Sequence, residues 1–345
     1  MPRCLLVMPQ SFYGFAATIA NGLEALGYTV TRANDEYPAN IFGKIMGKLD
    51  LPPVRWLTRR AFRARFLGGP RWDLVVICKG RGIGAALAGD LKHHADRVVG
   101  YHFDALAYDP ATARWGAAAD RVTTFDYRDA AVHGWPVVEL FSSLPAPEPL
   151  PPLRYKVSAI VRNHSQRLAY VDSIVSALGD ADNFVFIYEK SRIAFWGKAL
   201  LAPRLYWKWR HRIGFTPLPY ADYVNVLAAS AFTLDYAHPK QTGVTIRCFE
   251  ALAVGARIIT NNPQTLNSPY FGEHNTVVFG HTGDPAALTH AIAGFGGAAR
   301  PLQARRTPQT FLAEVVGDVF SSAGPPASPV DFPRPTASEA AQMQP

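Results

Sequence analysis

The stretch DYAHPKQTGVTIRCFEALAVGARIITNN, residues 235–262, decides the fold of this chain. Asp235 closes an apolar run, and a polar loop follows it as far as Gly243. A helix is predicted over residues 245–254, because Gly255 ends it before a second apolar run continues as a strand. The stretch is therefore a βαβ unit, and the backbone N–H groups at the start of its helix are suited to bind an anion.

The same alternation of strands and helices runs through most of the chain. It predicts parallel, doubly wound sheets, so the fold class is α/β. Strands are predicted at residues 4–8, 28–32, 74–78, 97–101, 121–124, 156–161, 183–188, 231–235, 257–260 and 276–279. Further helices are predicted at residues 15–26, 83–93, 167–178, 219–229 and 310–320, and one more starts at Pro285 with Asp284 as N-cap.

The segment PAPEPLPPL, residues 145–153, separates two such halves. Closely spaced prolines continue neither a helix nor a central strand, so this segment is predicted to be a linker. It leaves an N-terminal domain at residues 1–144 and a C-terminal domain at residues 154–323, each long enough to bury its own core. Residues 324–345 are rich in Pro, Ala and Ser and are predicted to be a disordered tail.

Several runs of sequence resemble a known family, the GT-B glycosyltransferases. The longest are FEALAVG at residues 249–255, IGFTPLPYADYVNVLAASAFTLDY at residues 213–236 and HTGDPAALTHAI at residues 281–292. Shorter matches resemble bacterial enzymes that build surface polysaccharide or lipopolysaccharide: FYG at residues 12–14, YHFD at residues 101–104 and TFD at residues 124–126. The resemblance implies two Rossmann-like domains that face an interdomain cleft, with the last helix packing back on the first domain.

The resemblance also implies a nucleotide-sugar donor site in the C-terminal domain. Glu250 matches the acid that grips the ribose of the donor in that family. Thr242 stands eight residues earlier, where retaining members often carry another acid, so the resemblance leaves retention or inversion open. Glu250 could instead only pair with Arg247 on a solvated helix face. Backbone and hydroxyl groups expected on the donor diphosphate come from Thr242, Gly243, Val244 and Thr245.

Cations follow the first two strands of the C-terminal domain, at the sheet edge where doubly wound proteins bind ligands. Each is either an exposed loop charge or a partner for the diphosphate of the donor. Because helix starts and cations can hold a diphosphate, the resemblance implies that no metal and no other cofactor is required. The candidates are Arg162, Arg167 and Lys190, together with His238 in the donor loop.

Asp104 and His102, at the end of a strand in the N-terminal domain, are candidates for a base that deprotonates an acceptor hydroxyl. Each could instead cap the following loop. The run KGRGIGAA before them places Gly80, Gly82 and Ala85 in a dinucleotide-binding spacing, which is the alternative of an NAD-dependent oxidoreductase. The D-x-D pattern at residues 180–182 precedes a strand instead of following one, so a plain turn is predicted there and no metal site.

The net charge of +8 is concentrated in two segments. Residues 41–66 hold seven Lys or Arg and one acid, and residues 190–212 hold seven and no acid, interleaved with Trp, Phe and Leu. This mixture favours an anionic membrane surface. A solvated basic face is the plainer alternative. Nucleic-acid sites also combine basic and aromatic residues, but we expect no nucleic-acid partner.

No apolar run approaches the length of a membrane span, and residues 1–8 lack the pattern of a signal peptide. We expect a cytoplasmic protein that is peripheral on the inner face of the plasma membrane. Three isolated cysteines indicate core residues and no disulfide framework or metal cluster. The predicted function is transfer of a sugar from a nucleotide-diphosphate sugar to a glycan or lipid-linked acceptor. A non-catalytic nucleotide-sugar or glycan-binding protein is the second alternative, beside the oxidoreductase.

Overall fold

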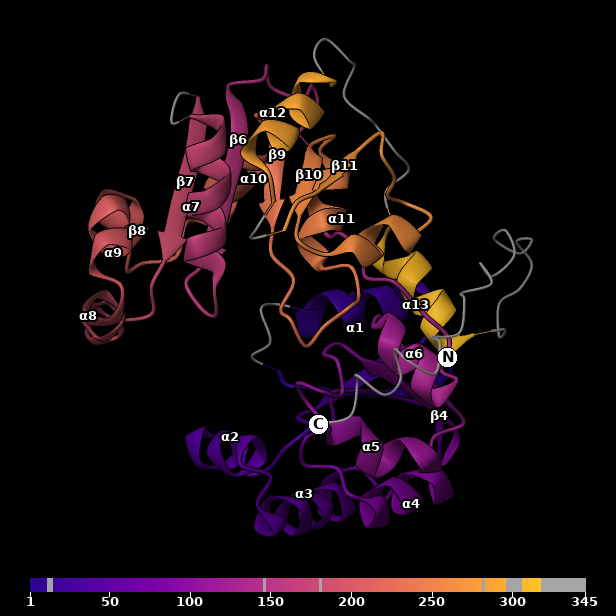
Figure 1. Cartoon of the computed structure of the whole chain (residues 1–345). Coiled ribbons are helices and arrows are strands. Elements are labelled where there is room, and N and C mark those ends of the chain that lie inside the picture. The colour runs from indigo at the N-terminus through magenta and orange to yellow at the C-terminus, as the bar shows by residue number, and fades with distance from the viewer. Residues whose placement is uncertain (11–14, 145–146, 180–181, 281–282, 296–305, 318–345) are drawn as a thin grey trace. The chain divides into compact units, whose positions relative to one another are not determined.

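The computed structural model describes residues 1–345 except 11–14, 145–146, 180–181, 281–282, 296–305 and 318–345 (Figure 1). The chain divides into two compact units. Unit 1 comprises Met1–Leu106, Pro110–Val138 and the chain from Leu312, and unit 2 comprises Ala107–Asp109 and Glu139–Phe311. The residues FYG at 12–14 and the predicted tail at 324–345 lie outside the described residues, as does part of the predicted linker.

Unit 1 is built on a five-stranded sheet in the order β2-β1-β3-β4-β5, with every pair of neighbours parallel. Its central strands are buried along almost their whole length, because helices cover a parallel sheet on both faces. The strands are β1 (Arg3–Val7), β2 (Thr29–Ala33), β3 (Trp72–Cys78), β4 (Ala95–His102) and β5 (Arg121–Thr124). The helices are α1 (Phe15–Ala25), α2 (Ile41–Lys48), α3 (Pro52–Arg65), α4 (Ala85–His93), α5 (Ala111–Trp115), η1 (Gly116–Ala118) and α6 (Tyr127–His133).

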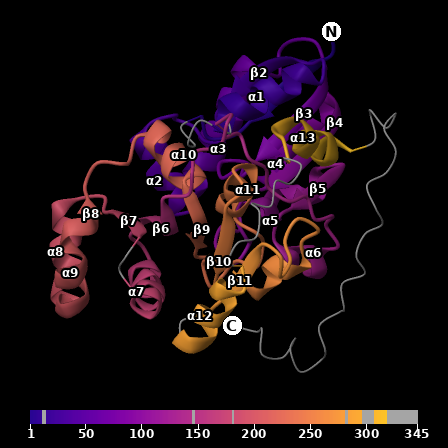
Figure 2. The same ribbon diagram turned by 90° about the horizontal axis from the view of Figure 1, so that it is seen from above.

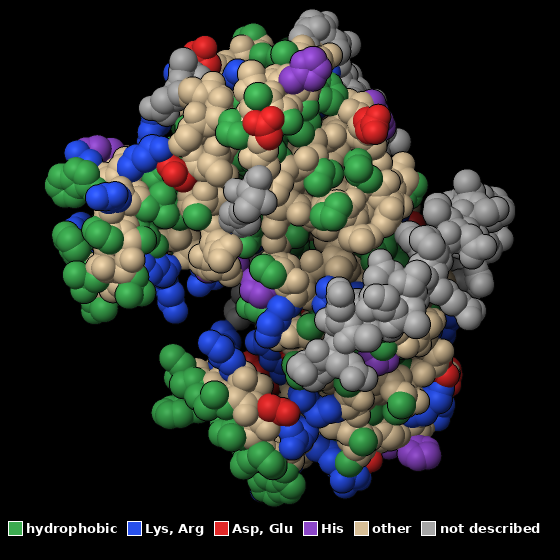
Figure 3. Space-filling model, viewed as in Figure 1, with side chains coloured by type: hydrophobic (Ala, Val, Ile, Leu, Met, Phe, Trp, Pro, Cys, Tyr) green, Lys and Arg blue, Asp and Glu red, His purple; other side chains and the backbone are tan. Residues whose placement is uncertain are grey.

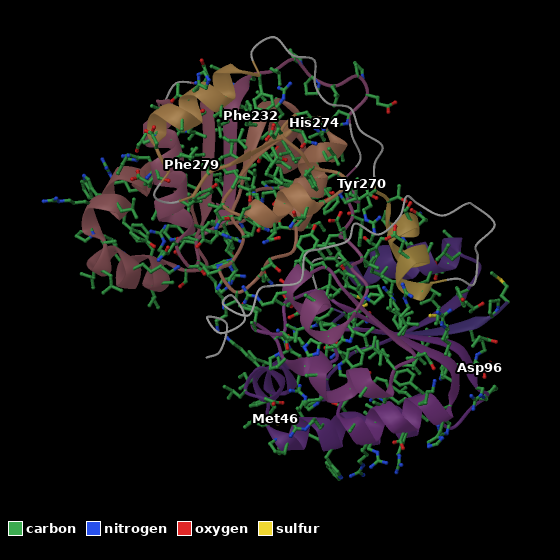
Figure 4. The ribbon with its side chains drawn as sticks, turned by 45° about the vertical axis from the view of Figure 1, so that its right-hand side comes forward. Met46, Asp96, Phe232, Tyr270, His274 and Phe279 are labelled. Carbon is green, nitrogen blue, oxygen red and sulfur yellow. The ribbon has the colours of Figure 1, made fainter. Side chains whose placement is uncertain are left out.

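Unit 2 is built on a six-stranded parallel sheet in the order β11-β10-β9-β6-β7-β8. Phe232 and Phe279 are buried in the core between this sheet and its helices (Figure 4). The strands are β6 (Tyr155–Arg162), β7 (Asn183–Tyr188), β8 (Ile213–Gly214), β9 (Ser230–Asp235), β10 (Arg257–Thr260) and β11 (Thr276–Val278). The helices are α7 (Arg167–Leu178), α8 (Arg192–Leu201), α9 (Pro203–Trp209), η2 (Arg210–Arg212), α10 (Tyr220–Ala228), α11 (Ile246–Ala253), η3 (Pro263–Asn267) and α12 (Pro285–Ala293).

The last described helix, α13 (Pro308–Val316), passes from unit 2 to unit 1 at Leu312. In unit 1, Arg121 donates a hydrogen bond to the carbonyl of Glu314, and Arg97 donates one to the carbonyl of Gly317. The α/β class with two doubly wound parallel sheets is confirmed. The N-cap predicted at Asp284 is confirmed as well, since its carboxylate accepts the Ala286 N–H at 3.0 Å.

The basic segment 41–66, for which we predict charge but no helix from the sequence, forms α2 and α3. Part of its charge is neutralised within unit 1, because Arg59 and Arg63 both pair with Asp90 on α4. These two guanidinium groups lower the pKa of the Asp90 carboxyl well below its usual range, with Arg59 as the larger cause. The segment is therefore a structural helix pair as well as a basic surface.

Asp182 lies in a turn with φ of 59°, directly before β7, and its carbonyl accepts the Lys156 N–H at 2.7 Å. Asp180, the other acid of the D-x-D pattern, lies outside the described residues. Across the described part of the chain, no three His, Cys, Asp or Glu side chains gather in an arrangement that could hold a metal ion. In the same part, no helix has both the length and the apolar character needed to cross a membrane.

Candidate functional site

A cavity of about 250 Å³ lies at the carboxyl ends of β6 and β7 in unit 2. This is the edge of a doubly wound sheet at which ligands bind. Strand β6 contributes its last three residues, and α10 and α11 contribute aromatic and cationic side chains. The lining residues used below are Arg162, Tyr188, Leu218, Tyr220, Tyr223 and Arg247.

Glu250 on α11 lies behind this lining, joined to it by Tyr223. The Tyr223 hydroxyl donates a hydrogen bond to Glu250 Oε2. Burial raises the pKa of Glu250, while the hydrogen bond from Tyr223 and the charge of Arg247 oppose that rise. Arg247 itself donates to the carbonyl of Ile160 on β6. The alternative in which Glu250 only pairs with Arg247 on a solvated face is therefore wrong.

Hydrogen bonds with two buried side chains, Asp235 and Asn262, hold the loop between β9 and α11. Asp235 accepts hydrogen bonds from the hydroxyls of Thr245 at 2.6 Å and Thr260 at 3.0 Å. The Asn262 amide donates to the carbonyls of Thr242 at 2.9 Å and Gly243 at 3.2 Å. These contacts fix the backbone of the loop in one conformation around its helix start.

Thr245 is the N-cap residue of α11, but its hydroxyl is directed to Asp235 and makes no capping hydrogen bond. Val244, next to it, is buried. Among the described residues, the N-cap side chain thus leaves the first N–H groups of α11 without a capping hydrogen bond, which is the arrangement that suits an anion at a helix start. Thr242, at the position of the absent acid, is held through its backbone in the same loop.

Positive charge concentrates beside this helix start. Arg167 on α7 donates to the carbonyl of Tyr236 at 3.3 Å, and burial, with Arg247 nearby, lowers the pKa of Arg167 to about 10. Burial and the neighbouring cations, Arg167 first among them, lower the pKa of His164 to about 4. The pKa of His238 is lowered as well, by desolvation and then by Lys240 and Arg167. Because Arg167 lowers the pKa values of neighbouring basic groups, the electrostatic potential here is positive and favours a bound anion.

Two of the predicted cations lie nearer to solvent. Arg162 ends β6, is exposed and lines the cavity. Lys190 is exposed and follows the buried Glu189, whose carboxylate accepts its backbone N–H at 3.1 Å. Of the predicted donor-site residues, Arg162 lines the cavity and Glu250 contacts the lining residue Tyr223. Arg167 and Lys190 are not among the lining residues.

The acceptor-side candidates lie in unit 1. Asp104 forms an ion pair with Lys79 at 2.5 Å, and both side chains are largely buried. His102 is fully buried, and its Nδ1 atom lies 2.7 Å from the hydroxyl of Thr112. A base must contact its acceptor, so in this conformation Asp104, which keeps some exposure, is placed better than His102. Both roles stay predictions.

The glycine loop after β3 is filled by protein atoms. A Cβ atom on Gly82 would lie 2.5 Å from Thr58 Oγ1 and 2.7 Å from the Asp35 carbonyl, and one on Gly80 would lie 2.5 Å from Trp115 Nε1. The Asp35 carboxylate accepts the Arg81 N–H at 3.1 Å. Close packing of protein atoms therefore accounts for both glycines without a dinucleotide.

Asp35 is expected to make the stability of the protein depend on pH. Its carboxyl is fully buried, and desolvation raises its pKa to about 6, against the opposing effect of the hydrogen bond from Arg81. A carboxyl whose folded pKa lies above the unfolded value stabilises the fold below about pH 4, and that contribution is lost as pH rises to about 6. Asp35→Asn is thus expected to be more stable than the unchanged protein above pH 6, by about 3 kcal/mol at most.

Urea denaturation at several pH values tests this expectation. The advantage of Asp35→Asn should shrink between about pH 7 and pH 4, since the wild-type carboxyl becomes protonated over that range. Asp96→Asn is the matched control, because Asp96 is an exposed residue of the same unit (Figure 4). If Asp35→Asn exceeds the unchanged protein in stability by the same amount at pH 7 and pH 4, the raised pKa of Asp35 is contradicted.

Comparisons with known proteins agree with this geometry. A family model described as glycosyl transferase-like matches residues 174–309, which include α10, α11 and the donor loop. No curated protein sequence matches the chain. The chain resembles the solved structure of sucrose-phosphate synthase from Thermosynechococcus elongatus with a TM-score of 0.58 at 12% identity, covering 92% of this chain and 95% of that one.

Two further solved structures share the fold. The lipopolysaccharide outer core galactosyltransferase WaaB, in its apo form, matches with a TM-score of 0.52 at 12% identity, over 92% of this chain and 96% of that one. UDP-GlcNAc 2-epimerase from Methanocaldococcus jannaschii matches with a TM-score of 0.51 at 12% identity, over 91% and 99%. The fold occurs in an epimerase too, so the family match is what separates the two activities. The chain thus shares its fold with these structures, and the glycosyl transferase-like match covers residues 174–309 of unit 2.

Residue patterns in the sequence point to Glu250, Arg162 and Arg167 but miss the tyrosines that line the cavity. Tyr220 and Tyr223 lie three residues apart on α10, so they share one face of that helix. The pKa of Tyr223 is raised well above its usual value by burial and then by Glu250. The spacing was available in the sequence, but the pairing with an acid 27 residues away was not.

Proposed function

We propose that the protein transfers a sugar from a nucleotide-diphosphate sugar to a glycan or lipid-linked acceptor, in the synthesis of bacterial surface polysaccharide or lipopolysaccharide. The observation that carries the proposal is one sheet edge that combines three features. These are the Tyr223–Glu250 pair, a helix start whose N-cap side chain makes no capping hydrogen bond, and the partly buried Arg167. The family match over residues 174–309 and the fold shared with WaaB support the class of reaction and of acceptor.

Each part of the donor has a suitable partner at this edge. The ionised Glu250 accepts hydrogen bonds from the two ribose hydroxyls, with Tyr223 holding the carboxylate in place. The base packs against apolar and aromatic side chains such as Leu218 and Tyr220. The diphosphate lies on the start of α11, within the field of Arg167 and the neighbouring cations.

The reaction forms a bond between an acceptor oxygen and the anomeric carbon, and it breaks the bond from that carbon to the diphosphate. The departing diphosphate gains negative charge, which fixed cations and helix N–H groups stabilise. We propose that these groups carry this stabilisation, with no metal required. Asp104 is the proposed base for the acceptor hydroxyl.

A thermal-shift screen tests the proposal most directly. The probes are UDP, GDP, ADP and dTDP, their common sugar conjugates, and NAD. At least one nucleoside diphosphate should raise the unfolding temperature and NAD should not, because protein atoms pack closely against Gly80 and Gly82 of the glycine loop. No shift with any nucleotide would sink the proposal. A second assay supplies a bacterial membrane extract as the source of acceptor. If a sugar conjugate binds but is not turned over in this assay, the result would support a non-catalytic binding protein instead.

A further inference from the structure

The helix pair α8 and α9 exposes an apolar face to solvent. Ile193, Leu200 and Leu201 are 82–87% exposed, and Trp196 is 64% exposed. The spacing of three, seven and eight residues from Ile193 places all four on one side of α8. Trp207 on α9 is exposed as well. Large aliphatic side chains gathered this way on a folded surface indicate a surface that is covered by something else.

The opposite face of the same pair is firmly packed. Phe195 and Leu205 contact the core of unit 2, and Tyr206 and Trp209 are buried in it. Figures 1 and 2 both show the pair at the edge of the sheet, beyond β8. The exposed side chains therefore belong to an ordered element that projects from unit 2, and the other face of that element is held in place.

The charges around the apolar side chains have one sign. Residues 190–212 hold seven Lys or Arg and no acid. Lys198 pairs with Glu189 and Lys208 with Asp172, both of which come from outside the pair of helices. Figure 3 shows blue cationic and green hydrophobic side chains gathered on this part of unit 2. The remaining cations are Lys190, Arg192, Arg204, Arg210 and Arg212.

We propose that the α8–α9 pair docks on a bilayer that contains anionic lipid, with Ile193, Leu200 and Leu201 in the headgroup boundary. Aliphatic and Trp side chains suit the boundary between headgroups and acyl chains, and the surrounding cations suit anionic headgroups. A projecting convex face enters a deformable bilayer without needing a complementary groove. The same mixture on α2 is a weaker candidate, because Arg59 and Arg63 of the adjoining α3 are already paired with Asp90.

The docking face is attached directly to the proposed donor site. Lys198 on α8 donates to the carbonyl of Asn163 at 2.7 Å and to both oxygens of the buried Glu189. Asn163 follows Arg162, and Glu189 follows Tyr188, which both line the cavity. The proposal extends the proposed function, because docking would hold the donor site beside a lipid-linked acceptor. Vesicle binding is nevertheless measured without any donor or acceptor.

Co-sedimentation of the full chain with vesicles tests the docking face. Vesicles of phosphatidylcholine with phosphatidylglycerol should carry the protein down at low salt, and vesicles of phosphatidylcholine alone should carry down much less. The combined variant Ile193→Ser, Leu200→Ser, Leu201→Ser should bind the anionic vesicles at least about tenfold more weakly. The matched control replaces three exposed aliphatic residues elsewhere in unit 2, Leu153→Ser, Leu266→Ser and Val278→Ser, and should bind as the unchanged protein does.

Two results would overturn the proposal. One is an unchanged protein that stays in the supernatant with anionic vesicles at low salt, which would point to a protein partner for this face. The other is a combined variant of the α8–α9 pair, Ile193→Ser, Leu200→Ser, Leu201→Ser, that sediments as well as its control. The thermal shift with a nucleoside diphosphate is recorded for every variant. A preserved shift shows that unit 2 is folded and that the donor site stands whatever the outcome with vesicles.

Discussion

Glu250→Gln is expected to weaken the binding of a nucleoside diphosphate by about 100-fold. A hydrogen bond to a charged acceptor contributes about 1.5–3 kcal/mol, and the substitution removes the charge that both ribose hydroxyls would meet. The amide keeps the shape of the side chain and can still accept from the Tyr223 hydroxyl. Because burial raises the pKa of Glu250, the charge is unfavourable in the folded protein, so the unfolding temperature should not fall.

Isothermal titration with the nucleoside diphosphate and the corresponding monophosphate measures this effect. Both ligands should lose the same factor, because the contact is to the ribose that they share. Glu273→Gln is the control, since it makes the same chemical change at an exposed position of unit 2. Tyr223→Phe should cost less, about tenfold, and its cost should grow as pH falls, because the lost hydrogen bond holds the pKa of Glu250 down. Unchanged affinity of Glu250→Gln for every nucleotide would end the assignment of the ribose site.

Arg167→Met is expected to weaken the binding of a nucleoside diphosphate, through the loss of a contact to its phosphates. Arg167 is partly buried near Arg247 and keeps one hydrogen bond, to the Tyr236 carbonyl, among its described partners. Its guanidinium is therefore destabilising in the empty protein, and removing it should leave the unfolding temperature the same or higher. Loss of a charge-assisted contact to phosphate should weaken diphosphate binding about 10- to 100-fold.

Isothermal titration of Arg167→Met with the nucleoside diphosphate and with the monophosphate tests this expectation. The affinity for the diphosphate should fall by a larger factor than the affinity for the monophosphate, in contrast to Glu250→Gln. Lys156→Met serves as control, because Lys156 is an exposed cation near the opposite end of β6. An equal loss for both ligands, or a loss of stability that accounts for the weaker binding, would place Arg167 outside the diphosphate site.

Much of unit 2 could be predicted because its signals are local. Helix α7 covers the predicted residues 167–178, strand β7 covers residues 183–188, and Asp284 caps α12. Each of these depends on apolar spacing, on a glycine after the helix or on a capping side chain within three residues. The helices in residues 41–66 were not predicted. The buried face of α3 has helical spacing at Val54, Thr58 and Phe62, but the polar Thr58 interrupts its apolar pattern among the many basic residues.

The sequence by itself determined the order of strands and helices, the two parallel sheets and the place of Glu250 on a helix after a loop, because short-range spacing and capping specify them. Only the tertiary structure decided which groups meet. Tyr223 reaches Glu250 from α10, the partly buried Arg167 donates to the Tyr236 carbonyl, and Asp35 accepts the Arg81 N–H of the glycine loop. Such contacts join residues far apart in the chain, and their charges and pKa values depend on burial, which exists only once the sheets and helices have packed.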